Sequence, residues 1–372
     1  MPEPHAHPDG AALTWLHVGD LHMDAAHPDR RLALERVVDE ARHFAGALDF
    51  AFLPGDNADN GTAEQYRLVR AALDRLRLPL RIIPGDHDFE PRSLDAYHGV
   101  LGAARLPAAA TISGHRCVFL DIVSAGTGGP DFRLGAGQLA WLEGELTGAS
   151  VRGETVALFM HSYPADLGAD AAPLGRLLDR HPPAIIDMGH THYNELGNDG
   201  RTIYAATRST GQAEEGPAGF SVSAVDQGAV SWRFKPLDSP WPLVLITAPA
   251  DRRLATRRPG MARPAGTIRA RAWHEAGIVR ATCRIDDAAP VEMRERDGVW
   301  SCPWSAPGDG EHRIAVRAET ASGAAGEDTI LAGGPPGATH APAGSDAHAI
   351  GAWEDRNILG TQLGPNRNGR KW

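Results

Sequence analysis

Residues 13–22 read LTWLHVGDLH, a short apolar run that ends in a glycine, an aspartate and a histidine. The run at residues 13–18 has the length and composition of a buried strand. Asp20 and His22 follow it directly and lie two residues apart. On an extended segment this spacing points both side chains the same way, so that they can bind one metal ion. The stretch therefore predicts a buried strand with metal ligands at its carboxyl end.

Similar apolar runs recur through the first two-thirds of the chain and alternate with amphipathic stretches. The runs that we expect to form strands lie at residues 50–53, 80–83, 118–123, 156–160 and 185–188. Helical spacing of apolar residues marks residues 34–48, 63–76 and 138–146. Alternating strands and helices predict a layered α/β domain built on a central sheet, which we place at residues 11–236.

The pattern changes after Pro236. Residues 239–242 read SPWP and look like a linker, and short alternating runs follow at residues 243–247, 267–272, 279–285, 299–304, 312–318 and 328–331. Asp-Gly turn dipeptides at residues 297–298 and 309–310 separate three of these runs. The pattern predicts a smaller all-β domain at residues 241–332, an antiparallel sandwich that looks immunoglobulin-like.

Residues 333–372 are a Gly/Pro-rich linker and a polar C-terminal tail. Such a composition favours a solvated chain, which is our expectation for this segment. The alternative is docking on the α/β domain, because the tail carries apolar and basic side chains that an acidic protein can bind. These side chains are Trp353, Ile358, Leu359, Leu363 and Trp372, with Arg356, Arg367, Arg370 and Lys371.

The charge and hydropathy of the chain exclude several classes of partner. Of its 372 residues, 37 are Lys or Arg and 47 are Asp or Glu, which gives a formal net charge of −10. This charge repels a polyanion, so we do not expect nucleic acid as a partner. Apolar stretches fall short of the roughly 18 residues of a membrane span, and residues 1–10 lack an apolar signal-peptide core. We therefore expect a cytoplasmic protein with no membrane association, and the sequence predicts no particular oligomeric state.

Cysteine and histidine usage narrows the metal chemistry. The three cysteines, Cys117, Cys283 and Cys302, are scattered along the chain and indicate neither a disulfide framework nor a thiolate metal site. The 17 histidines are the unusual count, and several of them follow apolar runs directly. Imidazole is therefore a more plausible metal ligand here than thiolate.

Five short polar clusters stand at the ends of predicted strands, at residues 19–22, 55–59, 85–88, 160–161 and 189–192. Ligands in open α/β sheets gather at the carboxyl ends of strands, so distant loops can converge on one point. The clusters contain four imidazoles and three carboxylates that suit a metal: Asp20, His22, Asp56, Asp86, His161, His190 and His192. Seven ligands are too many for one four-coordinate zinc ion and suit two metal ions of higher coordination, with one carboxylate bridging them.

In this order the clusters resemble the motifs of the calcineurin-like metallophosphoesterase superfamily, which read D-x-H, G-D-x-x-D, G-N-H-[DE], H and G-H-x-H. The resemblance covers roughly residues 13–234 and implies the layered sandwich fold of that superfamily. It also implies a dinuclear centre of two divalent or trivalent Mn, Fe or Zn ions. Asp56 would bridge the two ions, one of them held by Asp20, His22 and His192 and the other by Asp86, His161 and His190.

One position departs from the pattern of the superfamily. Asp86 stands where the third motif usually has a neutral Asn. A carboxylate there should bind the second metal ion more tightly and reduce its Lewis acidity. We therefore expect the substitution to affect the choice of metal and the class of substrate, and not metal binding itself.

Other polar residues near the clusters have secondary roles. By the resemblance, His87 contacts the phosphate and assists the leaving group. Asp59 and Asp88 have two equally plausible roles, as partners of the ligand or catalytic histidines and as caps of their loops. His17 lies inside the first predicted strand, and we expect it to be structural.

The resemblance implies a metal-dependent phosphoric ester hydrolase. We expect a phosphodiesterase that hydrolyses a small phosphodiester through a metal-bridging hydroxide, with His87 protonating the departing alkoxide. A small substrate is expected because the acidic chain shows no basic track for a polyanion.

Two alternatives stay open. The first is a nuclease of the same superfamily, because residues 15–24 also resemble the first motif of its exonucleases, and a basic groove beside the metals would favour it. The second is a non-catalytic metal-binding interaction module, in which Asp86 marks lost activity and the sandwich binds the partner. His87 argues against the second alternative, because a scaffold has no need of it.

Overall fold

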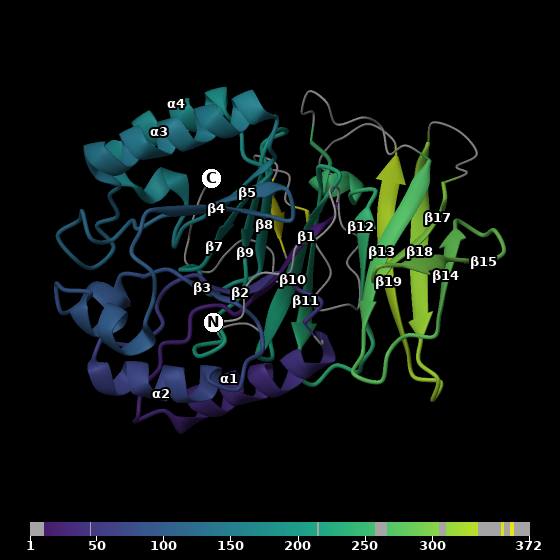
Figure 1. Cartoon of the computed structure of the whole chain (residues 1–372), viewed down its shortest axis with the longest axis horizontal. Helices are drawn as coiled ribbons and strands as arrows, with labels where there is room; N and C mark the ends of the chain where they lie inside the picture. The colour runs from purple at the N-terminus through teal and green to yellow at the C-terminus, as the bar shows by residue number, and fades with distance from the viewer. Residues whose placement is uncertain are drawn as a thin grey trace.

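The computed structural model describes residues 11–44, 46–213, 216–256, 266–304 and 310–333, together with the backbone of residues 351–352 and 358–360. Within these residues the chain forms two mixed sheets flanked by helices and, beside them, two smaller antiparallel sheets (Figure 1). Among the described residues, none of the helices has the length and hydropathy needed to span a bilayer.

The first mixed sheet has β1 at its centre. Its strand order is β11-β10-β1-β2-β3; β1, β2 and β3 run parallel, and β10 pairs antiparallel with both β1 and β11. The bounds are β1 Leu13–His17, β2 Phe50–Leu53, β3 Leu80–Ile82, β10 Gly219–Asp226 and β11 Ala229–Pro236. Helices α1 (Pro28–Glu40) and α2 (Ala63–Leu73) cover its outer face, where Leu34 and Val69 share a buried cluster with Leu16.

The second mixed sheet faces the first. Its strand order is β20-β21-β8-β9-β7-β6-β5-β4. The bounds are β4 Ala108–Ile112, β5 His115–Phe119, β6 Val156–Phe159, β7 Ile185–Met188, β8 Glu195–Asn198, β9 Ile203–Ala206, β20 Gly351–Ala352 and β21 Ile358–Gly360. Helices α3 (Gly135–Arg152) and α4 (Ala171–Arg180) pack on its outer face, and Trp15 and Phe50 of the first sheet pack on Phe159 of the second. The layers therefore run helix, sheet, sheet, helix, which confirms the predicted layered α/β fold (Figure 1).

Local sequence explains where several helices begin and end. Thr62 and Gln65 form a capping box that satisfies backbone groups at the start of α2. Pro28 occupies the first turn of α1, where its missing N–H costs no helical hydrogen bond. Gly153 ends α3 in a left-handed conformation with φ of 68°.

Two antiparallel sheets make up the all-β part, with strand orders β12-β13-β17-β16 and β15-β14-β18-β19. The bounds are β12 Leu243–Ala248, β13 Thr267–Trp273, β14 Arg280–Ile285, β15 Val291–Glu292, β16 Arg294–Arg296, β17 Val299–Pro303, β18 Glu311–Glu319 and β19 Ala325–Gly333. Val244 and Ile268 of one sheet and Val316 of the other share a buried cluster. These sheets confirm the smaller all-β region, while its immunoglobulin-like character and its boundaries at residues 241–332 stay predictions.

Part of the C-terminal tail is structured, contrary to the expectation from its composition. β21 pairs antiparallel with β8, and β20 pairs with β21, so this part of the tail extends the second mixed sheet. Without the tail, the edge of β8 would have backbone N–H and C=O groups without sheet partners, and β21 pairs with these groups. The amino-acid composition of the tail carries no information about such an edge, so composition could not predict the pairing. Trp353, Leu363 and the basic end of the tail lie outside the described residues, so the docking of these side chains stays a prediction.

Trp241, in the predicted linker, is packed between the α/β part and the all-β part. Its ring stacks on the ring of His43, with 4.0 Å between centroids and 14° between planes, and the Lys235 ammonium lies 4.6 Å from the Trp241 ring centroid. The indole N–H of Trp241 also donates to Glu40. Leu243 of β12 belongs to the same buried cluster as residues of α1. A shared core therefore joins the two parts.

Replacing Trp241 with Ala is expected to lower the free energy of unfolding by about 2–4 kcal/mol, because ring stacking and the cation–π contact are lost together. Urea unfolding at a fixed metal concentration measures the change. Trp241→Phe keeps a ring but lacks the indole N–H, and it should lose less. Equal stability of Trp241→Ala and the wild-type protein would contradict the packed linker.

Candidate metal centre

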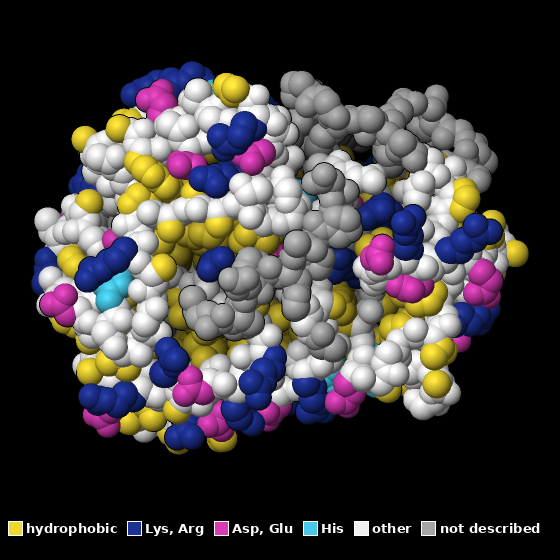
Figure 2. Space-filling model, viewed as in Figure 1, with side chains coloured by type: hydrophobic (Ala, Val, Ile, Leu, Met, Phe, Trp, Pro, Cys, Tyr) yellow, Lys and Arg dark blue, Asp and Glu magenta, His cyan; other side chains and the backbone are white. Residues whose placement is uncertain are grey.

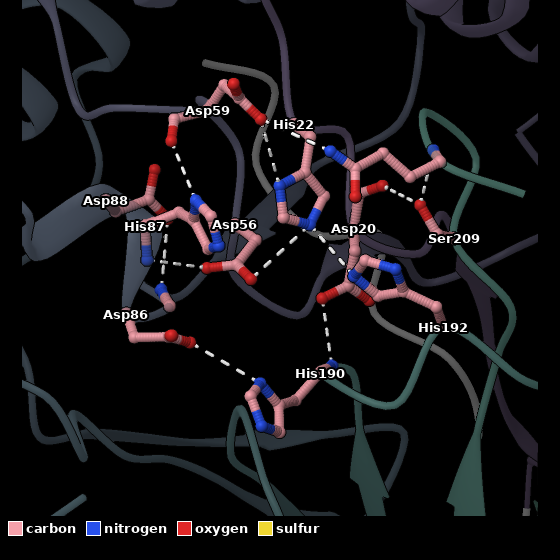
Figure 3. Close-up of polar contacts among 12 residues, drawn as sticks. Asp20, His22, Asp56, Asp59, Asp86, His87, Asp88, His190, His192 and Ser209 are labelled. Carbon is pink, nitrogen blue, oxygen red and sulfur yellow. Dashed lines mark hydrogen bonds and ion pairs between the residues drawn. The ribbon is translucent and has the colours of Figure 1, made fainter. Parts of the chain in front are cut away.

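The structure places all eight predicted site residues on segments that directly follow strands of the two mixed sheets, with His87 at the start of a short 3-10 helix. In the order of strands β1, β2, β3, β6 and β7, they are Asp20 and His22, Asp56, Asp86 and His87, His161, and His190 and His192. Their side chains converge at one point, although these segments are far apart in sequence, and Figure 3 labels all of them except His161. The expected convergence of the five clusters is therefore present.

A first group of ligand atoms comes from Asp20, His22, Asp56 and His192, which lie within 4.8 Å of one another. The Nε2 atoms of His22 and His192 are 2.9 Å apart, and His22 Nε2 lies 3.5 Å from Asp56 Oδ2. Asp20, His22 and Asp56 are buried. One cation can therefore meet all four side chains at once.

A second group comes from Asp56, Asp86, His161 and His190, again within 4.8 Å of one another. His161 Nε2 lies 3.2 Å from Asp86 Oδ1 and 3.5 Å from Asp56 Oδ2. His190 Nδ1 lies 3.4 Å from the same Asp86 oxygen. Asp56 is the member common to both groups, as a bridging ligand must be.

The donor atoms fit two divalent cations. Asp20 Oδ2 is buried and has no hydrogen-bond partner among the described residues, which is unusual for a carboxylate oxygen unless a cation binds it. The His161 Nδ1–H donates to the Pro54 carbonyl over 2.8 Å, which leaves Nε2 to face the second group. Imidazole and carboxylate together suit divalent first-row metals. The residues therefore fit a dinuclear metal centre.

Four of the proposed ligands have a left-handed backbone. The φ angle is 41° at His22, 49° at Asp56, 66° at His190 and 63° at His192. Non-glycine residues adopt this conformation rarely, at a cost of about 1–3 kcal/mol each, and such residues concentrate at functional sites. Gly85 permits the close approach of two loops, because a Cβ there would lie 2.1 Å from Asp56 Oδ1. The loops thus bring ligands together through turns that are individually unfavourable.

Asp56 and Asp86 are held in the ionised form. Burial raises the pKa of each carboxyl, but the neighbouring imidazoles, His161 foremost, outweigh burial and hold both pKa values well below the usual range. Conversely, burial lowers the pKa of His161, and the carboxylates around it raise that pKa well above its ordinary value. The side chains therefore supply negative charge that a pair of cations can balance.

His87 lies beside the first group and is positioned by Asp59. Its Nδ1–H donates to the Asp59 carbonyl over 2.7 Å, and its backbone N–H donates to Asp56 Oδ1 over 3.0 Å. The His87 and His22 rings are in contact, with 4.6 Å between centroids. Burial lowers the pKa of His87, but the Asp56 carboxylate, the Asp59 carbonyl and the Asp86 and Glu90 carboxylates together outweigh burial, so the pKa is raised overall. With Nδ1 engaged, Nε2 is the nitrogen that can meet a substrate.

Asp88 joins the loop after β2 to the loop after β3. Its buried carboxylate accepts hydrogen bonds from the backbone N–H groups of Asn57, Ala58 and Gly85 and from the side chains of Asn57 and Tyr66, over 2.9–3.1 Å. Burial raises the pKa of Asp88 to about 6, so the carboxylate form predominates at neutral pH. Of the two roles that the sequence left open, these contacts favour the loop cap, extended across two loops.

Asp59 is a partner of His22, one of the proposed ligands. Arg30 Nη1 donates to Asp59 Oδ1 over 3.0 Å and to the His22 carbonyl over 2.6 Å, and Asp59 Oδ1 lies 3.4 Å from His22 Nδ1. Gln212 Nε2 also donates to Asp59 Oδ1, over 3.3 Å. Sequence reasoning missed Arg30 and Gln212, because both lie outside the motifs and reach Asp59 only in the folded chain.

His17 links the two mixed sheets. Its Nδ1–H donates to Asp187 Oδ1 over 2.9 Å, and the Trp15 indole N–H donates to Asp187 Oδ2 over 2.6 Å. All three side chains are buried. β1 and β7, which carry these residues, are also followed by loops that hold proposed metal ligands, so the hydrogen bonds help to fix the relative position of those loops. This role agrees with the structural role expected for His17.

Comparisons with known proteins point to one family. The family model described as calcineurin-like phosphoesterase matches residues 13–194. Among curated relatives, the 3′,5′-cyclic adenosine monophosphate phosphodiesterase CpdA of Escherichia coli (strain K12) is 25% identical over 238 residues, which cover 60% of this chain and 84% of that protein. The glycerophosphodiester phosphodiesterase GpdQ of Enterobacter lignolyticus (strain SCF1) is 31% identical over 169 residues, which cover 42% of this chain and 60% of that protein.

Solved structures include a dimetal phosphatase from Danio rerio, which is similar with a TM-score of 0.47 and 14% sequence identity over 60% of this chain and 96% of that one. The family match is the stronger finding, because it runs from β1 to the loop after β7. It therefore includes both ligand groups and His87. Residues 13–194 therefore form a calcineurin-like phosphoesterase domain.

Proposed function

We propose that this protein is a dinuclear metal-dependent phosphodiesterase that hydrolyses a small phosphodiester. The observation that carries the proposal is the pair of ligand groups that share Asp56, with His87 beside them. Two cations bound there would hold the phosphate, stabilise the charge that develops on it and lower the pKa of a coordinated water toward neutrality.

The proposed metal ions are Mn, Fe or Zn, because these metals accept mixed imidazole and carboxylate ligands. We assign the ligands as follows: Asp20, His22 and His192 to one ion, Asp86, His161 and His190 to the other, and Asp56 to both. The grouping of the donor atoms supports this assignment.

His87 is the proposed proton donor to the leaving group. The Asp59 carbonyl holds the Nδ1–H, so the ring offers Nε2 to a substrate oxygen. A protonated imidazole there can give its proton to the departing alkoxide, which leaves as an alcohol. Arg30 holds Asp59 in place and thereby supports both His87 and His22.

A small substrate fits the charge pattern better than a nucleic acid does. Arg30, which contacts the ligand loops, is paired with Asp59 at 3.0 Å and is not available to a phosphate backbone. On the face shown in Figure 2, the described Lys and Arg side chains alternate with Asp and Glu and form no continuous basic track. The two named relatives act on a cyclic nucleotide and on glycerophosphodiesters, by their names, and both are small diesters.

The remaining parts of the proposal concern organisation and location. We propose a catalytic domain at residues 11–236, an immunoglobulin-like domain at 241–332 and a linker with a tail at 333–372. The end of β11 at Pro236 and the start of β12 at Leu243 support the first boundary. The proposed location is the cytoplasm, on the sequence grounds given above.

Replacing His87 with Ala is expected to lower kcat by about 10²- to 10⁴-fold, because the leaving group then departs without a proton. Both metal ions should be retained, since His87 is not among the proposed ligands. The loss should be smaller for a p-nitrophenyl ester than for an alkyl ester, because p-nitrophenolate needs no protonation. An equal loss for both esters would contradict the proton-donor role.

Hydrolysis assays with a panel of diesters and monoesters, each with Mn²⁺, Fe²⁺ and Zn²⁺ in turn, test the proposed function. We expect turnover of small diesters with at least one metal. Protein that binds two equivalents of metal and hydrolyses none of these esters would instead support the non-catalytic module.

A further inference from the structure

Asp86 places a third carboxylate against the two metal positions. Its Oδ1 lies 3.4 Å from His190 Nδ1 (Figure 3) and 3.2 Å from His161 Nε2, so all three donors face the same point. The Asp86 side chain is only 10% exposed. Its charge would therefore act on a cation bound there, and on any anion that the cation holds, with little screening by water.

Counting the charges of the ligands shows which anion fits. Asp20, Asp56 and Asp86 supply three negative charges, while coordinating histidines are neutral. Two divalent ions supply four positive charges, so ligands and ions together carry one net positive charge. While the coordinated water is neutral, a singly charged anion neutralises this centre, whereas a doubly charged anion leaves an excess negative charge in a buried site, which is costly. A hydroxide formed from that water adds one negative charge in both cases and leaves the difference between the two anions unchanged.

The charged groups around the ligands largely offset one another. Arg30 pairs with Asp59 at 3.0 Å. His87 in its protonated form faces Glu90, whose Oε1 lies 3.4 Å from His87 Nδ1. Asp88 accepts hydrogen bonds from five neutral donors, which stabilise its carboxylate and leave its negative charge in place. None of these neighbours is an unpaired positive charge that would cancel the negative charge of Asp86.

We propose that Asp86 selects substrate by charge, favouring phosphodiester monoanions over phosphomonoester dianions. The inference rests on the proposed function and specifies its substrate class. A diester carries one negative charge, whereas a monoester carries nearly two at neutral pH, because its second pKa is about 6. Asp86→Asn would raise the net charge of the loaded centre by one and shift the preference toward dianions.

The expected size of the shift follows from Coulomb's law. One unit of charge acting over about 6 Å in a partly buried site changes binding roughly 10- to 100-fold. Removing the carboxylate of Asp86 should strengthen the binding of both anions, and that of the dianion by the larger factor. The ratio of the two affinities should therefore change roughly 10- to 100-fold in favour of the dianion.

Binding of two inert probes tests this inference without relying on turnover. Phenylphosphonate is a dianion well above its second pKa, and its monomethyl ester is a monoanion of nearly the same shape. Calorimetric titration of each probe into metal-loaded protein gives the affinity ratio, and elemental analysis verifies two metal equivalents. The wild-type protein is expected to prefer the monomethyl ester, and Asp86→Asn to lose or reverse that preference.

Two further variants separate charge from geometry. Asp39 is exposed on α1 and pairs with Arg75, so Asp39→Asn removes one negative charge outside the site and should leave the affinity ratio unchanged. Asp86→Glu keeps the negative charge and should keep the preference for the monoanion. If Asp86→Asn does not hold two metal ions, Asp86→Glu becomes the variant that tests whether Asp86 selects by charge. A loss of preference in Asp86→Glu as large as in Asp86→Asn would overturn the inference.

Failure of this inference is distinguishable from failure of the proposed function. Suppose that the protein hydrolyses diesters and that Asp86→Asn changes the ratio of the two probe affinities by no more than about twofold, well below the Coulomb expectation. This result would refute charge selection by Asp86 and leave the proposed function intact. No hydrolysis of any ester by protein loaded with two ions refutes the proposed function. In that case the probe titration still shows whether Asp86 sets the charge of the anion that binds.

Discussion

Replacing Asp56 with Ala is expected to remove at least one metal ion and to abolish hydrolysis. Asp56 is the one residue that belongs to both proposed ligand groups, so its loss leaves each ion short of a donor. The two ions would also repel each other without a carboxylate between them. Elemental analysis after dialysis measures the metal content, and the loss of activity should exceed that of His87→Ala.

Matched variants make the Asp56 result specific. Asp56→Asn has nearly the same shape and tolerates the left-handed backbone, with φ of 49°, that position 56 requires. It should lose metal for lack of charge, without local refolding. Asp39→Ala removes an exposed carboxylate outside the site and should keep both ions. Retention of two equivalents by Asp56→Ala would contradict the bridging role.

Replacing Asp88 with Ala is expected to lower the free energy of unfolding by about 3–4 kcal/mol, because several buried donors lose their acceptor at once. Three of those donors are backbone N–H groups, of Asn57, Ala58 and Gly85, which cannot turn toward water without moving the ligand loops. Metal affinity should therefore fall together with stability. Denaturant unfolding and metal titration above pH 7 measure the two quantities.

Asp88→Asn is the informative control for this prediction. It keeps the size of the side chain and one acceptor oxygen but presents an NH₂ group to donors, so its loss should be intermediate. A destabilisation of Asp88→Ala below about 0.5 kcal/mol, which is typical of surface positions, would show that the two loops hold their shape without Asp88.

The site could be predicted from the sequence because its information is local. Each ligand follows directly after an apolar run, and the runs at residues 50–53 and 185–188 coincide with β2 and β7. The carboxyl ends of the strands then bring the ligands together, so the motif order sufficed to find Asp20 and His192 without knowledge of the packing. The assignment of each residue as a metal ligand stays a prediction for elemental analysis to test.

What the sequence did not predict depends on tertiary packing. β10 lies beside β1 in the first sheet, yet its buried Ser221 and Ser223 alternate with apolar residues and do not resemble a strand buried on both faces. The run expected as a strand at residues 118–123 is shifted, because β5 is His115–Phe119. Residues such as Leu120 and Ile122 are apolar because they pack in the cluster that includes α3 and α4, not because they belong to the sheet.

Because four of the proposed ligands have a left-handed backbone, substitutions that stabilise the fold at these positions would remove metal binding when this enzyme is engineered. Glycine adopts such φ angles freely, at a gain of up to about 1 kcal/mol per position, but it has no donor atom. A directed-evolution screen scored on thermal tolerance alone would therefore enrich glycine at His22, Asp56, His190 and His192 and destroy the metal centre. Selection for robustness needs metal retention as a second criterion, or a library restricted to positions outside these loops.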